Sequence, residues 1–475
     1  MPHASFFLDA FLRGFPYEPT PCQDRLLSAV ARFLSSDDGD ILVVNGYAGT
    51  GKTTAVAAVV AGLGSLELQT VLLAPTGRAA KVLSSYAGKP ASTIHKFIYR
   101  QKSFGSDGFG LFSLSPNKSR STLFVVDEVS LIGIEADAST GGGAFGSGNL
   151  LEDLVAFVRS GVDCRLLLIG DAAQLPPVGL EASPALEPAF MDHFGGVSYA
   201  TLTTVVRQAR DSGILANATH LRTLLDSMDA PLELQELGLQ VNGYPDIQRL
   251  SGGELLETLS DAYARYGDDE VVVLCRSNKR AGRYNAGIRA QVLFREERLV
   301  RDDKLMIVKN HYNAQLEGTD YIANGDIATL VWIRHFEERY GLQFADACLS
   351  FPDYGGQEVE MKVLLDTLES DSPSLPYAQA QALYQGVMED YADIRGKKKR
   401  YEAVREDPFF SALQIKYAHA ITGHKAQGGQ WKCVFVDNPF WQDFLIPDDI
   451  KWLYTALTRG IEKVYLVNFR DQLFR

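Results

Sequence analysis

Cysteine is scarce in this chain, and its spacing is irregular. The 475 residues contain five cysteines, and no two of them form a Cys-x-x-Cys pair. An odd and scattered set argues against a disulfide framework and against a cysteine-based zinc site. It favours a reducing compartment, so we expect a cytoplasmic location.

Long apolar runs are also missing. We find no uninterrupted apolar run of about 18 residues, the length that a membrane helix needs, and therefore predict no membrane span. The partly apolar residues 1–15 are interrupted by Asp9 and lead to no clear small-residue cleavage site. We accordingly expect no signal peptide.

Positive charge is in deficit. The formal net charge is −13, and an acidic surface repels the phosphates of a nucleic acid. Nucleic-acid binding therefore requires a channel of local positive potential within an otherwise acidic surface.

Short apolar strands alternate with helical segments in both halves of the chain. In the first half they are residues 40–45, 70–74, 122–126 and 165–169. In the second half they begin near Val271, Cys433 and Val464. This alternation is typical of parallel sheets covered on both faces by helices. Residues 305–408 differ, because β-like patches are followed there by a charged helical stretch.

A phosphate-binding sequence follows the first expected strand. Residues 46–53 read Gly-Tyr-Ala-Gly-Thr-Gly-Lys-Thr, between an expected strand and an expected helix, which is the context of a P-loop. Its glycines let backbone N–H groups approach phosphates, Lys52 reaches the β- and γ-phosphates, and the Thr53 hydroxyl ligates Mg²⁺. We expect ATP and Mg²⁺ as cofactors, with ATP bound by Gly46, Ala48, Gly49, Thr50, Gly51, Lys52, Thr53 and Thr54.

A second acidic signal closes the third expected strand. Asp127 and Glu128 follow the apolar run LFVV. An aspartate at this position holds Mg²⁺, and the adjacent glutamate polarises the attacking water. The two motifs predict an NTPase but do not identify the process that it drives, because P-loop kinases, AAA machines and transporters share both motifs.

Further segments occur in a specific order along the chain. They are residues 74–81 (APTGRAAK), 92–96 (STIHK), 170–178 (GDAAQLPPV), 207–208 (RQ), 323–326 (ANGD), 424–428 (HKAQG) and 453–460 (LYTALTRG). Through them the chain resembles the superfamily 1B helicases of the RecD/Dda type over most of its length. One departure is Gly423, where the family usually carries an apolar or β-branched residue.

The resemblance implies an α/β fold with two RecA-like P-loop domains built on parallel sheets. A β-hairpin is inserted in the first domain, and an SH3-like β subdomain with a helical arm is inserted in the second. The expected boundaries are 1–95 and 122–205 for domain 1A, 96–121 for the hairpin domain 1B, 206–304 and 409–475 for domain 2A, and 305–408 for domain 2B.

The resemblance also implies roles for single residues. Gln23 would read adenine, and Asp127 would join Thr53 in holding Mg²⁺. Arg207 and Arg459 would reach the γ-phosphate from the second domain. The implied catalytic set is Lys52, Glu128, Gln174, Arg207 and Arg459. The implied contacts to single-stranded DNA are Pro75, Thr76, His95, Asn310, Thr422, His424 and Lys425.

Residues 96–121 combine basic and aromatic side chains. They contain five basic residues, one acidic residue and four phenylalanines, a mixture that suits a backbone groove with a base-stacking wedge. Phe104 and Phe109 flank a turn signal, which favours a hairpin. The family carries its strand-separating pin here, so both phenylalanines become candidate DNA contacts. The alternative is a solvated loop whose phenylalanines pack onto the domain.

The resemblance implies an ATP-dependent 5′→3′ DNA helicase that translocates on single-stranded DNA and acts on forked duplexes. It also implies a bacterial or phage-type intracellular setting. We expect a monomer, with single-stranded-DNA-binding, repair or replication proteins as further partners. Alternatives are an ATPase that translocates or remodels without strong unwinding, an RNA helicase, and a small-molecule kinase or nucleotide-switched module. A small-molecule kinase or a nucleotide-switched module would leave Arg459 and the HKAQG segment unexplained.

Overall fold

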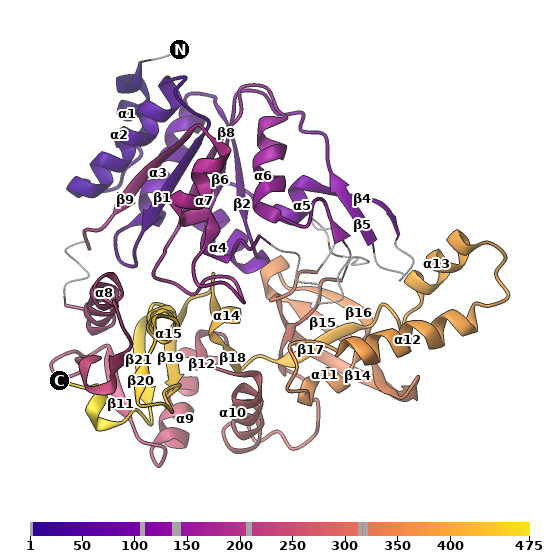
Figure 1. Ribbon diagram of the computed structural model, residues 1–475. Coiled ribbons are helices and arrows are strands. Elements are labelled where there is room, and N and C mark those ends of the chain that lie inside the picture. The colour runs from indigo at the N-terminus through magenta and orange to yellow at the C-terminus, as the bar shows by residue number, and fades with distance from the viewer. Residues whose placement is uncertain (1–2, 105–109, 135–143, 206–210, 312–315, 317–321) are drawn as a thin grey trace.

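The computed structural model describes residues 3–104, 110–134, 144–205, 211–311, 316 and 322–475. Figure 1 shows two α/β units one above the other, with a barrel and a helical arm beside the lower unit. Within these ranges, no helix combines the length and the apolar character needed to cross a membrane.

The first sheet has six parallel strands in the order β3-β2-β6-β8-β1-β9. These strands are β1 (Ile41–Gly46), β2 (Gln69–Ala74), β3 (Ala91–Thr93), β6 (Thr122–Val126), β8 (Arg165–Gly170) and β9 (Val197–Leu202). Alternate side chains of a strand point to opposite faces, and both faces of this sheet are buried.

Helices cover each face of the first sheet. One face packs against α1 (Ala4–Arg13), α2 (Pro21–Ser35), α3 (Lys52–Ser65) and α4 (Gly77–Ala87). The other packs against α5 (Ile94–Ile98), α6 (Leu150–Arg159) and α7 (Pro188–Met191). Because β6, β8 and β1 are neighbours, the loops that follow them meet at one edge of the sheet, where parallel sheets bind ligands.

The second sheet has five parallel strands in the order β11-β21-β19-β12-β18. They are β11 (Ile247–Leu250), β12 (Val271–Cys275), β18 (Ala420–Thr422), β19 (Trp431–Asp437) and β21 (Gly460–Val467). One face packs against α8 (Gly213–Asp226), α14 (Gly423–Ala426) and α15 (Pro447–Leu457), and the other against α9 (Leu255–Tyr266) and α10 (Asn278–Gln291). A short antiparallel pair, β10 (Leu232–Glu233) and β20 (Phe444–Leu445), lies outside this sheet.

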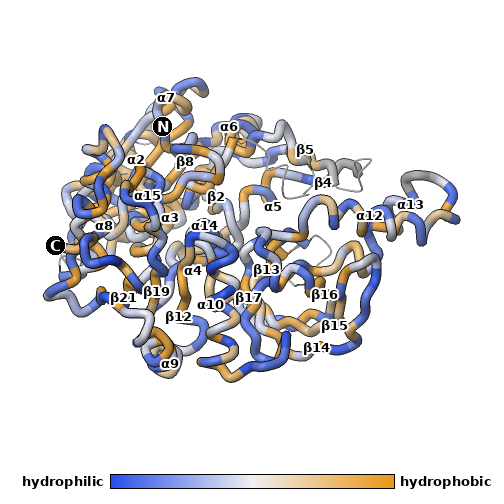
Figure 2. The backbone as a smooth tube through the Cα atoms, turned by 60° about the horizontal axis from the view of Figure 1, so that its bottom comes forward, coloured by the Kyte–Doolittle hydropathy of each residue, from blue (hydrophilic) through white to orange (hydrophobic). Residues whose placement is uncertain are grey.

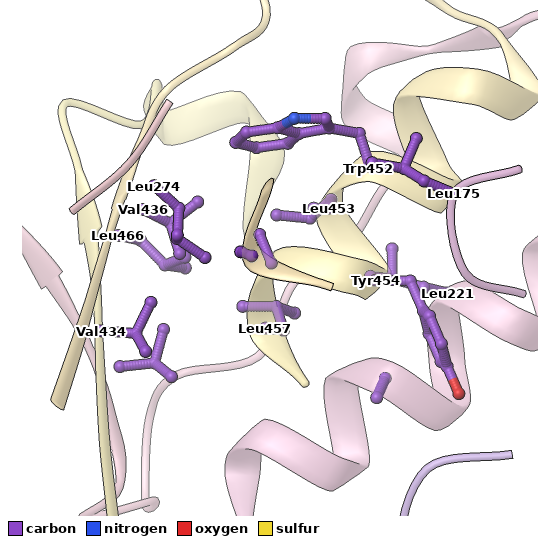
Figure 3. Close-up of a cluster of buried hydrophobic side chains, with 14 of the residues drawn as sticks. Leu175, Leu221, Leu274, Val434, Val436, Trp452, Leu453, Tyr454, Leu457 and Leu466 are labelled. Carbon is purple, nitrogen blue, oxygen red and sulfur yellow. The ribbon is translucent and has the colours of Figure 1, made fainter. Parts of the chain in front are cut away.

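The core of the second unit extends into the first. Ala173 and Leu175 follow β8 of the first sheet, yet they belong to the cluster of buried side chains around α15 and β19. Figure 3 shows Leu175 among the labelled side chains of this cluster, near Trp452 of α15. The two α/β units therefore share a continuous apolar contact.

The third unit is a closed barrel. Its strands are β13 (Lys304–Ile307), β14 (Ile327–Arg339), β15 (Leu342–Phe351), β16 (Gln357–Leu364) and β17 (Leu413–Tyr417). Its helices are α11 (Asp366–Glu369), α12 (Tyr377–Asp390) and α13 (Lys397–Glu406). The barrel has its own apolar core. A separate apolar cluster around Phe344 and Phe409 joins the helical arm, formed by α12 and α13, to the barrel. Figure 2 shows hydrophobic residues gathered in the sheets and their helices, with hydrophilic stretches at the outer margin of the barrel.

The hairpin expected in the first domain is present. It consists of β4 (Tyr99–Phe104) and β5 (Gly110–Leu114), which pair antiparallel. A third strand, β7 (Ala144–Phe145), pairs parallel with β5. This strand comes from the Gly-rich segment 141–148, which gives no strand signal.

The predicted α/β fold with two parallel sheets, a hairpin and an inserted β subdomain is confirmed. The sequence predicts four strands in the first sheet, and the structure adds the short β3 and the half-exposed edge strand β9. In the second sheet it adds β11 and β18. The barrel also includes β17, which lies beyond residue 408, the expected end of the insertion.

Candidate functional site: a nucleotide cleft between two domains and the surface beside it

The P-loop connects β1 to α3 at the carboxyl edge of the first sheet. Gly49 and Gly51 have φ values of 72° and 77°, a left-handed region in which a side chain is disfavoured. A Cβ on Gly46 would approach the stem of Lys52 to 2.6 Å. α3 begins at Lys52 with no side-chain cap, so its first backbone N–H groups are available to an anion.

Lys52 is held over this loop by two acceptors. Its ammonium donates a hydrogen bond to the Gly46 carbonyl and lies 3.5 Å from the Asp171 carboxylate. The Thr50 hydroxyl donates to the Tyr47 carbonyl at 2.7 Å and closes the turn. The other residues expected to bind the nucleotide, Ala48, Thr53 and Thr54, belong to the same loop or to the first turn of α3.

Gln23 supports the loop from α2. Its carboxamide oxygen accepts from the Thr20 N–H at 2.8 Å, and its Nε2 donates to the carbonyl of Thr50 at 3.2 Å. Only 3% of the residue is exposed. The residue expected to read adenine therefore lies against the P-loop backbone and fixes the start of α2 to it.

Asp127 and Glu128 follow β6, one strand away from β8. The Asp127 carboxylate accepts hydrogen bonds from the Tyr86 hydroxyl and from the Glu128 N–H, the latter at 2.8 Å. Glu128 has a left-handed backbone, with φ of 54°, which costs about 1–3 kcal/mol for a residue with a side chain. This conformation is one that the surrounding structure must impose.

The Glu128 carboxyl group is buried and incompletely paired. Its Oε2 atom has no hydrogen-bond partner among the described residues. Burial raises the pKa of Glu128, and the nearby Arg459 guanidinium and Lys52 ammonium oppose that rise only in part. An unpaired carboxyl oxygen facing cations at the edge of the P-loop is suited to accept a hydrogen bond from a water molecule.

The loop after β8 links the two α/β units. Gln174 is 5% exposed, and its Oε1 atom also has no partner within the described part of the chain. The next residue, Leu175, donates its N–H to the Thr455 hydroxyl at 2.9 Å and accepts from Gln427 Nε2 at 2.8 Å. The motif that carries Gln174 is therefore fixed by α15 and by the residue that follows α14 in the second unit.

Tyr454 makes the most direct contact with the P-loop from the second unit. Its hydroxyl donates to Asp171 at 2.7 Å and accepts from the Ala48 N–H at 2.8 Å. In Figure 3 this hydroxyl points away from the aliphatic centre of the cluster. The sequence places Tyr454 in a motif, yet we did not predict it or Asp171 as site residues.

Arg459 follows α15 and is 4% exposed. Its guanidinium donates to the Thr455 and Gly429 carbonyls, each at 3.2 Å. It also lies close enough to Glu128 to affect the pKa of that carboxyl group. The second unit thus brings a cation to the carboxyl edge of the first sheet. Arg207, the other expected arginine, lies outside the described residues.

The residues expected to hold Mg²⁺ suit an ion that keeps several of its waters, rather than an ion surrounded by protein ligands. Thr53 is exposed on the first turn of α3, and Asp127 lies half-buried after β6. Among the described residues, no group of three or more His, Cys, Asp or Glu side chains is placed to bind a metal. Mg²⁺ usually keeps several waters and takes one or two protein ligands plus phosphate oxygens, which these two residues and the orphaned Glu128 oxygen can accommodate.

Four of the expected DNA contacts lie in the described part of the first domain. Pro75 precedes α4, and the Thr76 hydroxyl caps that helix by accepting from the Ala79 N–H at 3.2 Å. His95 lies on α5, and burial lowers its pKa to about 4, so the imidazole is neutral at physiological pH. Phe104 ends β4, whereas Phe109 lies outside the described residues.

The other expected DNA contacts lie where the second sheet meets the barrel. Lys425 donates to the Asn324 side chain at 2.6 Å, and the Asn324 N–H donates to Asn310 at 2.7 Å. Thr422 and His424 are half-buried in the same segment. Burial lowers the pKa of Lys425 to about 8, and a neighbouring lysine, Lys416, contributes to the lowering. The structure therefore brings four expected residues together with Asn324, which we did not predict.

Domain 1A also contacts the units around it through α4. The Arg78 guanidinium stacks over Trp431 at 4.0 Å, and Lys81 forms an ion pair with Asp353 of the barrel. A Cβ on Gly77 would lie 2.7 Å from the Asp326 carboxylate. The start of α4, where Pro75 and Thr76 lie, is thus next to both the second sheet and the barrel.

Two family models match parts of the chain. An AAA domain matches residues 23–224, and a UvrD-like helicase C-terminal domain matches residues 417–467. The first contains the P-loop, and the second contains His424 and Arg459. Both halves of the cleft described above therefore fall within matched regions.

Two curated relatives carry similar sequences. The ATP-dependent RecD2 DNA helicase of Deinococcus radiodurans is 36% identical over 186 residues, which are 38% of this chain and 21% of that protein. The ATP-dependent DNA helicase dda of Enterobacteria phage T4 is 23% identical over 457 residues, covering 90% of this chain and 94% of the relative. The match thus spans about a fifth of the first relative and nearly all of the second.

Solved structures of Pif1 helicases are similar over nearly the whole chain. One, of two coordinating Pif1 helicases at forked double-stranded DNA, has a TM-score of 0.49 at 15% identity and covers 97% of this chain and 94% of that chain. The Pif1 helicase of Candida albicans has a TM-score of 0.41 at 14% identity, with 96% of both chains covered.

Proposed function

Because the chain belongs to the superfamily 1B helicases of the RecD/Dda type, we propose that it couples ATP hydrolysis to 5′→3′ movement along single-stranded DNA and to the unwinding of forked duplexes. The observation that carries this proposal is the position of Arg459. This arginine belongs to the second α/β unit, yet it is buried near Glu128 of the first. Hydrolysis then depends on how the two units meet.

In this proposal the cleft stabilises charge on the γ-phosphate. Phosphoryl transfer needs positioning and charge stabilisation more than covalent chemistry. Lys52 contacts the phosphates, Glu128 accepts a proton from the attacking water, and Gln174 positions that water. Arg459, with Arg207, supplies positive charge from the second unit. Mg²⁺ bound through Thr53 and Asp127 would neutralise charge on the phosphate oxygens, and Gln23 would contact the adenine.

Hydrolysis is coupled to DNA because the same segments serve both sites. The HKAQG segment carries Lys425 at the proposed DNA surface and Gln427 in the hydrogen bond to Leu175. A change in how the second unit meets Gln174 therefore moves the DNA-contacting residues as well. Since ATP favours the closed arrangement, each hydrolysis step can shift the two DNA-binding surfaces relative to one another.

The proposed DNA surface has contributions from both units and from the barrel. Pro75, Thr76 and His95 bind from the first unit, and Thr422, His424, Lys425 and Asn310 bind from the second unit and the barrel. The hairpin, with Phe104 and Phe109, would separate the strands of a fork. We place this activity in the cytoplasm and in one copy of the chain, alongside single-stranded-DNA-binding, repair or replication proteins.

Unwinding of duplexes that carry one single-stranded tail, either 5′ or 3′, tests the proposal. The wild type with ATP should separate a duplex with a 5′ single-stranded tail and leave a 3′-tailed duplex intact, because movement is 5′→3′. Lys52→Ala should separate neither duplex, since it lacks the phosphate contact. Separation from the 3′ tail alone would contradict the polarity.

The same assay distinguishes two other functions. Stimulation of ATP hydrolysis by single-stranded DNA without strand separation would indicate a translocase or remodeller. Preference for an RNA tail of the same sequence would indicate an RNA helicase. Equal activity in Lys52→Ala would contradict the assignment of the nucleotide site.

A further inference from the structure

Phe145 joins three aromatic rings that come from different parts of the first domain. Its ring stacks on Phe112 of the hairpin, with centroids 4.3 Å apart and planes at 11°. It lies 5.2 Å from the His95 ring, edge to face at 80°, and 5.2 Å from the Tyr99 ring. Aromatic pairs in these geometries contribute attraction beyond their buried area. One side chain therefore contacts the hairpin and a proposed DNA-binding residue at the same time.

Backbone hydrogen bonds hold the same segment to the hairpin. β7 pairs with β5, with Phe145 opposite Phe112. Beyond the strand, the Gly146 N–H donates to the Phe112 carbonyl at 2.9 Å. A two-stranded hairpin alone is marginally stable in water, and a third strand increases its stability. β7 thus stiffens a hairpin that would otherwise depend on a single strand pairing.

The far end of the segment is anchored to α6. Asn149 caps that helix by accepting from the Leu151 and Glu152 N–H groups. The buried carboxylate of Asp153 accepts from the Ser147 N–H at 3.0 Å and from the Tyr99 hydroxyl at 2.7 Å. The segment 144–149, which we call the brace, therefore connects a helix of the domain core to the hairpin.

Gly146 shows that the brace has little freedom to shift. Its φ is 47°, and a Cβ there would lie 1.8 Å from the Asp153 carboxylate and 2.9 Å from the Tyr99 ring. Only glycine fits this position without displacing the carboxylate. The brace therefore has one arrangement relative to α6, and the ring of Phe145 has one place against the hairpin.

We propose that Phe145 is a positioning residue that fixes the hairpin relative to His95, so that force on the DNA strand in the first domain is transmitted to the strand junction. This inference rests on the proposed helicase function. A hairpin that separates strands must resist displacement by the duplex, and the brace supplies that resistance from α6. Phe145 itself need not contact DNA, ATP or Mg²⁺.

The test compares Phe145→Ala with Phe145→Tyr, which keeps the ring. The matched control is Phe190→Ala, because Phe190 is half-buried against the same core cluster, and among the described residues its ring pairs with His193 and Phe194. We expect Phe145→Ala to lower the rate of fork unwinding at least about tenfold, while kcat for ATP hydrolysis with single-stranded DNA stays within about twofold. Phe145→Tyr and Phe190→Ala should unwind like the wild type.

Two results would overturn the proposal. One is wild-type unwinding by Phe145→Ala. The other is an equal loss of unwinding and of DNA-stimulated hydrolysis, because the ring would then support the domain as a whole. Absence of unwinding by the wild type would instead count against the proposed helicase function.

A separate measurement tests the brace even in that case. The Phe145 ring contributes to the burial that holds the pKa of His95 near 4. In Phe145→Ala, the NMR titration of His95 should shift upward towards the ordinary value of 6.5, while Phe190→Ala leaves it unchanged. An unchanged His95 titration in Phe145→Ala would show that the ring does not hold this part of the domain.

Discussion

Replacing Glu128 by glutamine separates its chemical role from its effect on stability. Glutamine keeps the shape of the side chain but cannot take a proton from water. A general base contributes about 10²- to 10⁴-fold to a rate, so kcat for DNA-stimulated ATP hydrolysis should fall at least about 100-fold in Glu128→Gln. The affinity for ATP should stay close to that of the wild type, since Lys52 and the P-loop are unchanged.

The same substitution should stabilise the fold at neutral pH. Burial raises the pKa of Glu128, so the folded protein favours the neutral form of this side chain. Its Oε2 atom has no partner within the described residues. Glutamine removes the cost of keeping a negative charge on this buried side chain, so the unfolding midpoint at neutral pH should rise.

The pH dependence has a definite sign. A carboxyl group with a raised pKa in the folded state destabilises the fold increasingly as pH rises above its unfolded value, here 4.5. Glu128→Gln should therefore be more stable than the wild type at pH 7.5, and the difference should shrink towards zero near pH 4. The measurement is thermal unfolding at both pH values, with Glu257→Gln on the exposed surface of α9 as the control. A kcat within threefold of wild type, or a lower midpoint at pH 7.5, would refute the reasoning.

Two further substitutions address the domain interface and the DNA surface. Tyr454→Phe removes the hydroxyl that bonds Asp171 and Ala48. Unpaired buried groups cost about 1–3 kcal/mol each, so the closed arrangement should weaken and the Kd for ATP should rise about tenfold or more, as measured with a fluorescent nucleotide. An unchanged Kd would count against this contact. Lys425 has a pKa of about 8, so its positive charge is lost above that pH. Wild-type affinity for single-stranded DNA should weaken between pH 7 and 9, and Lys425→Arg should remove that part of the dependence. If the affinity of Lys425→Arg for single-stranded DNA kept the same pH dependence, the assignment of Lys425 as a DNA contact would be contradicted.

The contiguous parts of the nucleotide site follow directly from the sequence. A glycine loop between an apolar strand and a helix has one common structural outcome, so Lys52 and Thr53 could be placed without coordinates. Asp127 and Glu128 follow a strand, and neighbouring parallel strands bring their carboxyl ends to one edge. The order of the strands explains why these residues meet.

Contacts between distant segments are not visible in the same way. Tyr454 reaches the P-loop, and Arg459 lies near Glu128, because α15 packs against the loop that carries Leu175. No local pattern encodes that packing, and the family resemblance alone pointed to Arg459. Nothing in the sequence indicated that the Tyr454 hydroxyl would contact the P-loop, although Tyr454 lies in the same motif as Arg459.

Gly423 illustrates a departure that only packing explains. The family usually has a larger residue here than the glycine that this chain carries. In the structure a Cβ at Gly423 would lie 2.7 Å from the indole nitrogen of Trp452, which is 1% exposed. Trp452 therefore occupies the space that a larger residue at position 423 would need.

β7 was missed for a different reason. A strand of two residues within a glycine-rich segment has no alternation to detect. Its role depends on Phe112 and His95, which the chain brings near Phe145 only after folding. The one signal in the sequence is the aromatic residue Phe145 among the glycines of this segment.

The central claim is that a residue of the second α/β unit completes the nucleotide site of the first. Single-turnover hydrolysis of bound ATP by Arg459→Ala, with saturating single-stranded DNA, tests this claim most directly. An arginine that stabilises the γ-phosphate contributes about 10³- to 10⁵-fold, so hydrolysis should fall at least about 1,000-fold while ATP still binds. Hydrolysis within a few-fold of the wild-type rate would contradict the account.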